Sequence, residues 1–269
     1  MSLSKKQKKI ATHLPIYLVL AWLLPKTIAV LFLCGIVDFL RNRPITLHLA
    51  YQYFFSIGTL TWLLSPVNLF MDLITLKWRT HYQPSDFPTD CQNEIDALLS
   101  SVDKNQLIQA LEKNMNDKER GMIFFKWYGE NIQNDIQVPA FEKEFKYIKT
   151  IGISAFNRNC STSRHFGPLR ITLRLLYNLQ PVQSDGVYIE VANHKHYWHN
   201  NPLFIFDDTR IHQSFNEYDA IRYCMFVDIL RPSPFNALSN AMLQVVNYFA
   251  QKNKFIFYKK WKNIGKKTP

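Results

Sequence analysis

The chain has 269 residues, enough for one sizeable core or one core with a small appendage, and its composition is ordinary for a globular protein apart from abundant Phe and Tyr. It carries 32 basic and 21 acidic side chains, and the lysines that crowd its two ends leave the middle close to neutral. No nucleic-acid partner is expected, because the basic residues sit in the tails. These end lysines are Lys5, Lys6, Lys8, Lys9, Lys252, Lys254, Lys259, Lys260, Lys262, Lys266 and Lys267.

Residues 1–80 are more apolar than the rest and predict a membrane-anchoring helical segment with one or two apolar helices. Residues 16–37 are apolar apart from Pro25 and Lys26. Residues 49–71 carry no charge and are long enough to cross a hydrocarbon layer of roughly 30 Å. An interfacial pair that never crosses, or two core helices of a soluble protein, remain the alternatives.

Basic residues flank both apolar segments, with Lys77 and Arg79 after the second. Two crossing helices with both ends in the cytoplasm fit this distribution and predict the inner (cytoplasmic) membrane, with the rest of the chain facing the cytoplasm. The basic termini favour anionic lipid head groups, at roughly 1 kcal/mol for each basic residue near the surface. The cysteines lack metal-binding spacing, and free thiols fit a reducing compartment: Cys34, Cys91, Cys160 and Cys224.

Residues 81–138 are expected to form a linker and a helical support region. Residues 81–88 are polar and contain proline. Residues 91–128 read as helical, because apolar side chains recur at helical spacing. These side chains include Ile95, Leu98, Leu99, Leu107, Ala110 and Leu111.

Residues 139–235 change to short β-rich runs separated by turn-rich stretches, which predicts a compact barrel or jelly roll. The expected strands cover 147–155, 169–177, 186–192, 203–206 and 221–229. Residues 236–269 then predict a basic amphipathic C-terminal helix that can lie on a membrane. The fold class expected is α+β, with a jelly-roll core (a double-stranded β-helix), flanking helices and the membrane-associated segment.

Most of the eight histidines have ordinary interpretations as surface or turn residues. The cluster H-K-H-Y-W-H at 194–199 is weak evidence for a metal, because its spacing lies in a turn-like stretch. His165 and His212 differ from the others in the residues around them.

Three strings carry a resemblance to a known family: R-H-F-G-P at 164–168, F-D-D-T-R-I-H at 206–212 and R-Y-C-M-F-V-D-I-L-R-P at 222–232. They resemble the aspartyl/asparaginyl β-hydroxylase family of Fe(II)/2-oxoglutarate dioxygenases. A similarity to the lipid A acyl-chain hydroxylase branch extends further towards the N-terminus. It includes S-P-V-N-L-F-M at 65–71, D-F-P at 86–88 and F-F-K-W-Y at 124–128.

The resemblance implies a role for each of five residues. His165 and His212 would hold Fe(II), and Arg222 would clamp the distal carboxylate of the cosubstrate 2-oxoglutarate. Ser154 would add a hydroxyl donor, and Arg174 would face the carboxylate nearest the iron. His165, His212 and Arg222 are the catalytic candidates. Neutral imidazole suits ferrous iron, and a guanidinium gives a two-pronged fork for a carboxylate.

The sequence departs from the family pattern at two positions. Gly167 stands where most non-haem iron oxygenases carry an acidic ligand. The aspartyl hydroxylase branch also lacks that acid, whereas lipid A hydroxylases tend to carry one. Leu176 replaces a histidine donor. Asp207 and Asp208 are expected to orient His212 or end a strand, as second contacts of the metal site.

The function implied is hydroxylation of an unactivated C–H bond, with O2 consumed and 2-oxoglutarate converted to succinate and carbon dioxide. The apolar segments and the basic C-terminus favour a fatty acyl chain on a membrane lipid, of the lipid A or aminolipid type. Gly167 favours aspartyl or asparaginyl residues in peptides instead. A decayed site that only binds a ligand is the alternative that is not an enzyme.

Overall fold

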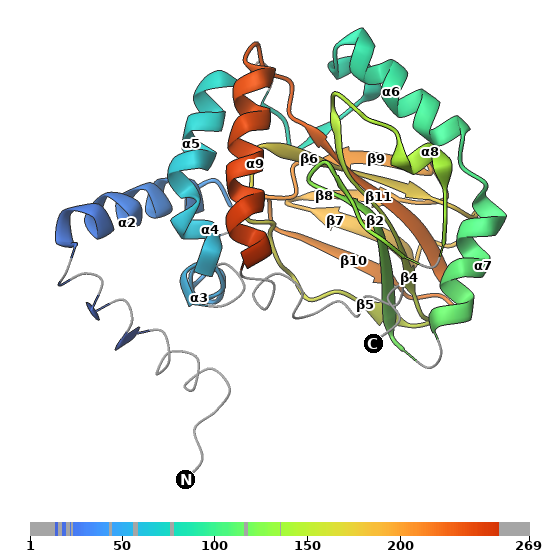
Figure 1. Ribbon diagram of the computed structural model, residues 1–269. Helices are drawn as coiled ribbons and strands as arrows, with labels where there is room; N and C mark the ends of the chain where they lie inside the picture. The colour runs from blue at the N-terminus through green and yellow to red at the C-terminus, as the bar shows by residue number, and fades with distance from the viewer. Residues whose placement is uncertain are drawn as a thin grey trace.

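The structure is a computed structural model that describes residues 14–15, 18–19, 22, 24–42, 45–55, 59–75, 78–115, 118–134 and 136–252. Two β-sheets form its centre and helices flank them (Figure 1). The large sheet has the strand order β1-β9-β6-β11-β4-β2-β3, and the small sheet has the order β5-β10-β7-β8. The strands are β1 (His81–Tyr82), β2 (Arg120–Trp127), β3 (Glu130–Asn131), β4 (Ile148–Phe156), β5 (Cys160–Ser161), β6 (Thr172–Asn178), β7 (Val187–Val191), β8 (His194–Tyr197), β9 (Leu203–Phe206), β10 (His212–Asn216) and β11 (Arg222–Leu230).

The chain passes back and forth between the two sheets from β4 to β11. Strands β4, β6, β9 and β11 lie in the large sheet, and β5, β7, β8 and β10 lie in the small one. Every pair among these strands is antiparallel. This order is that of a double-stranded β-helix, so the predicted jelly-roll core with flanking helices is confirmed.

The prediction of helix throughout 91–128 is confirmed up to Met115 and wrong at the end of the range, where the chain forms a strand. The helices there are α6 (Thr89–Ser100) and α7 (Lys104–Met115), and the chain then forms β2, which pairs with β4 and β3. Most of β2 is buried, and a short apolar run of this kind looks alike in a buried strand and a buried helix.

The large sheet is covered on both faces, which explains why β4 and β11 are buried at every position. Alternate residues point to opposite faces of a strand. Tyr223, Met225, Val227 and Ile229 of β11 pack into the main apolar core with residues of α6, α7, α8 (Pro139–Glu142) and α9 (Asn236–Lys252). The other face of the sheet looks toward the small sheet, and the candidate site lies there.

The N-terminal helices stand to one side of the two sheets (Figure 1). They are α2 (Pro25–Phe39), α3 (Leu47–Phe55), α4 (Thr59–Leu63) and α5 (Ser65–Ile74), with a short 3-10 turn η1 (Pro84–Asp86) after them. The continuous helix expected over 49–71 is wrong: three short helices occupy this stretch, and a proline stands in the first turn of α5. Within the described residues we find no helix with the length and apolar character needed for a bilayer crossing. The lysines at 5–9 and 254–267 lie outside the described residues.

Candidate active site

One pocket between the two sheets is lined by all five residues that the sequence motifs single out. They are Ser154, His165, Arg174, His212 and Arg222. Ser154 lies on β4, Arg174 on β6 and Arg222 on β11, so neighbouring strands of the large sheet supply three of them. The histidines come from the side of the small sheet.

The two histidines face each other across a short stretch of antiparallel pairing. His212 is the first residue of β10, and His165 lies outside the named strands in an isolated bridge to it. The His165 amide donates to the His212 carbonyl oxygen at 3.0 Å, and the His212 amide donates back at 2.8 Å. The ring centroids are 4.3 Å apart. His212 therefore begins a regular strand, whereas His165 lies outside one.

Backbone carbonyls orient both imidazole rings. Nδ1 of His165 lies 2.6 Å from the Ser163 carbonyl oxygen, and Nδ1 of His212 lies 2.8 Å from that of Arg210. A neutral imidazole that donates from Nδ1 carries its lone pair on Nε2, the atom that can bind a metal. Burial, with help from the neighbouring His165, lowers the pKa of His212 well below its ordinary value and favours this neutral form.

Arg222 brings a buried positive charge to the pocket. It is only 2% exposed, and its guanidinium lies 4.5 Å from the centre of the Trp198 ring and 5.1 Å from that of Phe156. Its Nε donates to Asn178 at 3.4 Å, but Nη1 is buried without a hydrogen-bond partner. Within the described residues, no acidic side chain forms an ion pair with it. A buried charge of this kind is stabilised by an anion, and a ligand carboxylate fits.

Arg174 differs from Arg222, because its charge is already compensated. Its Nε lies 2.6 Å from a carboxylate oxygen of Asp228, and Nη2 lies 3.4 Å from one of Asp208. Burial lowers the pKa of Arg174, but the two carboxylates outweigh that effect and raise it overall. Asp228 is the residue directly opposite Arg174 in the sheet register and holds it in place.

Asp208 occupies the space beside Gly167. A β-carbon placed on Gly167 would lie 2.4 Å from Oδ2 of Asp208, and the Gly167 amide donates to the Asp208 carbonyl oxygen at 2.6 Å. Burial raises the pKa of Asp208 to about 7. A carboxylate from the residues that connect β9 to β10 thus fills the volume that a side chain at 167 would need. The sequence alone does not show that the Asp208 carboxylate occupies the side-chain space at position 167.

Asp207 follows the last residue of β9, which fits the expected role of ending a strand, and its carboxylate pairs with arginines instead of orienting His212. Its carboxylate lies 2.9 Å from Nη2 of Arg231 and 3.5 Å from Nη2 of Arg41, and it accepts from the Thr209 hydroxyl at 2.5 Å. It is fully buried, which raises its pKa, but the surrounding arginines reverse the effect and lower it overall. Asp207 therefore joins the N-terminal helices to the barrel.

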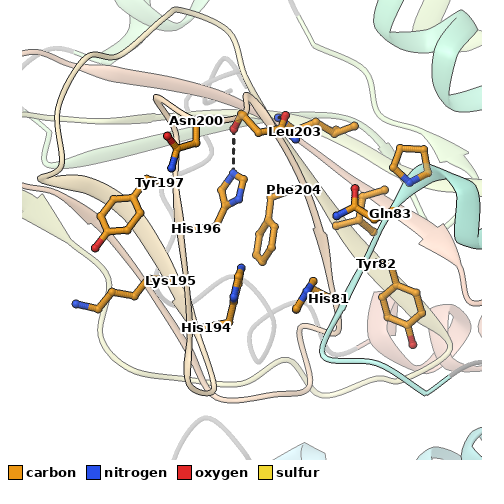
Figure 2. Close-up of a pocket in the computed structure, with 13 residues that line it drawn as sticks. His81, Tyr82, Gln83, His194, Lys195, His196, Tyr197, Asn200, Leu203 and Phe204 are labelled. Atoms are coloured by element: carbon orange, nitrogen blue, oxygen red, sulfur yellow. Dashed lines mark hydrogen bonds between the residues drawn. The ribbon is translucent and has the colours of Figure 1, made fainter.

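A second pocket lies at the edges of the two sheets and contains His81, which the sequence did not single out (Figure 2). Its volume is about 310 Å³. His81 stacks on His194 with ring centroids 4.4 Å apart, and His196 stacks on Phe204 at 4.3 Å. His199 instead faces Asp185 at 3.5 Å. In the described part of the chain, no three or more His, Cys, Asp or Glu residues are placed to hold a metal ion, either in this pocket or around His165 and His212.

The sequence profile of the family described as Aspartyl/Asparaginyl beta-hydroxylase matches residues 89–232, more than half of the chain. The chain belongs to the aspartyl/asparaginyl β-hydroxylase family. The matched range contains all five site residues. It does not contain the N-terminal helices α2 to α5.

A curated relative of this family member is the ornithine lipid ester-linked acyl 2-hydroxylase of Rhizobium tropici. The two are 26% identical over 171 residues, which is 60% of this chain and 60% of the relative's length. The chain thus spans less than two thirds of that relative.

Two solved structures show a distant likeness. TT1209 from Thermus thermophilus is 13% identical with a TM-score of 0.30, over 45% of this chain and 95% of that one. An oxidoreductase of the 2OG-Fe(II) oxygenase family from Burkholderia pseudomallei is 11% identical with a TM-score of 0.33, over 52% and 91%. The jelly-roll assignment rests on the strand order of the two sheets.

Leu176 makes one wall of the pocket apolar in this family member. It packs against a cluster formed by Met122, Phe124 and Phe226. Trp127 also packs there, with its ring centroid 5.0 Å from that of Phe124. Three of these side chains, Met122, Leu176 and Phe226, line the pocket itself. The missing histidine is therefore replaced by a surface suited to an apolar group.

Proposed function

We propose that the chain is an Fe(II)- and 2-oxoglutarate-dependent hydroxylase whose metal is held by Nε2 of His165 and His212. The observation that carries this proposal is the pairing of two inward-facing imidazoles with Arg222, a buried guanidinium that has no acidic partner among the described residues. Ferrous iron accepts neutral imidazole, and the guanidinium matches the distal carboxylate of 2-oxoglutarate.

When bound, iron and 2-oxoglutarate supply the oxidising chemistry, in which O2 is consumed, succinate and carbon dioxide are released and a C–H bond is hydroxylated. The chain's own residues bind and orient. The carbonyls of Ser163 and Arg210 fix the two ring planes, and Arg222 holds the distal carboxylate. Ser154, whose hydroxyl donates to the Cys224 carbonyl oxygen at 3.3 Å, lies close enough in the pocket to assist Arg222.

Two further groups protect the reaction. Met122, Leu176 and Phe226 line the pocket with apolar surface that excludes water from the reacting C–H bond. Arg174 is held in a fixed position by Asp228 and Asp208, so its guanidinium N–H groups stay in the pocket as hydrogen-bond donors. We assign Arg174 to the carboxylate of 2-oxoglutarate nearest the metal.

The substrate we propose is a fatty acyl chain of a membrane lipid, of the ornithine-lipid type in preference to lipid A. The name of the Rhizobium tropici relative supports an aminolipid, and the apolar pocket wall suits an acyl chain. The protein would then work at the cytoplasmic face of the inner membrane. A peptide aspartyl or asparaginyl substrate is the second candidate, favoured by Gly167, which offers no carboxylate to the metal.

Succinate release tests the activity. Purified protein with Fe(II), 2-oxoglutarate and ornithine lipid should release succinate and add one oxygen to an acyl chain, as seen by mass spectrometry. His212→Ala should abolish both, whereas His199→Ala, which removes the partly exposed histidine beside Asp185, should leave both unchanged. Oxygen gain on an Asp- or Asn-containing peptide but not on the lipid would select the second candidate. Full turnover by His212→Ala would refute the metal assignment.

A further inference from the structure

The N-terminal helices expose large apolar side chains to solvent. Leu47 is 91% exposed and Leu73 is 81% exposed. Val30, Leu33 and Val37 of α2 and Leu40, the residue directly after it, all have exposed side chains, and their spacing of three and four residues places them on one face. We name these four residues the outer stripe of α2. Exposed apolar patches of this kind mark interaction sites.

The opposite face of α2 is also apolar and is already used. Leu31, Gly35 and Phe39 pack toward α3 and α4, where Phe39 joins Tyr53 and Trp62 in a small apolar core. A helix that is apolar on both faces is typical of one that is covered on both faces, in a core or in a membrane. Figure 1 shows α2 projecting from the body of the molecule, so the remaining cover has to come from outside the described chain.

The charge of this region indicates the kind of cover. The first 85 residues contain nine basic side chains and only two acidic ones, Asp38 and Asp72. Asp38 is 2% exposed and Asp72 is 7% exposed. Lys26, in the first turn of α2, is exposed. A surface that offers apolar and basic groups without an exposed carboxylate complements an anionic bilayer and repels neither its head groups nor its acyl chains.

Both acidic side chains form ion pairs that hold α2 and α5 against the barrel. Arg170, which is 1% exposed, pairs with Asp38 and, at 2.8 Å, with Asp72. Asn68 of α5 accepts from the Arg170 amide at 2.9 Å and donates to the Pro168 carbonyl oxygen at 3.1 Å. These contacts hold Pro168 and Arg170, which lie a few residues after His165 in the chain.

The same helices grip the second histidine segment. Oδ1 of Asn42, just after α2, accepts from the Ile211 amide at 3.0 Å. Ile211 precedes His212 and Phe166 follows His165, and both pack with Tyr53 in the small apolar core. The Tyr53 and Phe166 ring centroids are 5.6 Å apart. The helices that expose apolar surface thus contact the immediate neighbours of both histidines.

We propose that the outer stripe of α2 docks on a bilayer that contains anionic lipid, and that docking sets the histidine end of the barrel against that bilayer. The second half of this statement rests on the function proposed above. It gives a lipid substrate a short route to the pocket, because the docking helices and the two histidine segments form one packed unit.

Vesicle co-sedimentation of the full chain tests the docking surface. Wild type should sediment with phosphatidylglycerol-containing vesicles and more weakly with pure phosphatidylcholine vesicles. Leu33→Glu combined with Val37→Glu should weaken binding at least about 10-fold, because two apolar contacts are lost. Tyr218→Glu, at an exposed position (41%) in the loop between β10 and β11, is the control away from α2 and should bind as wild type does.

A second measurement separates docking from activity. The doubly substituted variant should bind Mn²⁺ and 2-oxoglutarate as wild type does, because neither residue touches the pocket. Equal sedimentation of wild type and this variant would overturn the proposal, since the basic termini alone would then account for binding. Dimerisation of wild type through α2 with no vesicle binding would overturn it as well. Vesicle binding through α2 without succinate release would keep the docking surface and refute the proposed function instead.

Discussion

Gly167 is a glycine because another residue's carboxylate occupies its side-chain space. A β-carbon at this position would lie 2.4 Å from Oδ2 of Asp208, far inside van der Waals contact. Gly167→Ala should therefore destabilise the fold by about 1–3 kcal/mol, the usual cost of overpacking. Chemical denaturation of the metal-free protein measures this loss.

The double variant tests the cause. Gly167→Ala should cost much less stability when it is introduced into Asp208→Ala than when it is introduced into wild type, because the clashing carboxylate is gone. If the double variant loses as much unfolding free energy as the two single variants together, the close approach of Asp208 is not the reason for glycine at this position.

His196 gives the protein a stability that depends on pH. Burial lowers the pKa of His196 to about 4, and the neighbouring His194 and Arg222 also lower it. Below pH 6.5 the unfolded imidazole takes up a proton that the folded one refuses. The neutral His196 therefore costs the folded state nothing above pH 6.5, and the unfolding free energy decreases as the pH falls from 6.5 toward 4. His196→Gln should flatten the fall of the unfolding free energy across this range, while His48→Gln, at an exposed position, should not.

At the residue scale, the motifs predicted which side chains share a site, and all five line one pocket. The partners of those side chains were harder to predict. Arg174 pairs with Asp228 because the two stand opposite each other in the register of β6 and β11. Spacing along the chain does not contain that register, nor the approach of Asp208 to Gly167 or of His81 to His194.

At the element scale, the ion pairs around Arg170 hold the N-terminal helices to the barrel. Removing one partner of a buried ion pair leaves the other charge uncompensated, which costs about 3–5 kcal/mol. Asp38→Asn should cost about 3 kcal/mol, the lower end, because Arg170 keeps Asp72. The loss should be accompanied by faster proteolysis within α2.

An exposed ion pair provides the control for Asp38→Asn. Arg158 and Asp219 lie 3.4 Å apart, and the Asp219 side chain is 83% exposed. Asp219→Asn should change stability by less than about 1 kcal/mol, as surface ion pairs do. If Asp38→Asn costs no more than this control, the ion pairs do not fasten α2 to the barrel.

Helices and strands were predicted well where the apolar pattern of the sequence is compatible with only one type of secondary structure. Strand β9 matches its expected range, and β4, β6, β7 and β11 begin and end within a few residues of theirs. The helix expected at β2 fails because β2 is buried on both faces and lacks the alternation that identifies a strand. The uncharged run 49–71 predicts one helix, whereas the structure has three short helices there that pack on one another and on the histidine segments.

At the scale of the whole molecule, burial of the large sheet on both faces determines where the site lies. Helices cover the outer face, and the inner face carries Ser154, Arg174 and Arg222 toward the small sheet. The histidines reach the same space from the opposite side, so the pocket is closed by parts of the chain that are far apart in sequence. Ligands that bridge these parts should stabilise the fold as a whole.

Thermal unfolding measures that linkage without turnover. A ligand present at about 100 times its dissociation constant adds about 2.7 kcal/mol, which corresponds to a rise in Tm of about 5–10 °C for a chain of this size. Mn²⁺ should raise the Tm, and 2-oxoglutarate should raise it further only when Mn²⁺ is present. His212→Ala should lose both increments. Arg222→Gln should keep the first and lose the second.

Arg164→Gln is the matched control for Arg222→Gln. Arg164 lies beside His165 but is partly exposed and pairs with Glu190 at 2.8 Å on the surface. It should retain both increments, because its guanidinium does not face the pocket. A 2-oxoglutarate increment that survives Arg222→Gln but is lost in Arg164→Gln would move the cosubstrate's distal carboxylate from the interior of the barrel to its rim. Chelation of Mn²⁺ by EDTA should remove the Mn²⁺ increment from wild type. Relative to its own metal-free Tm, wild type should then show no increment, as His212→Ala shows none with Mn²⁺ present.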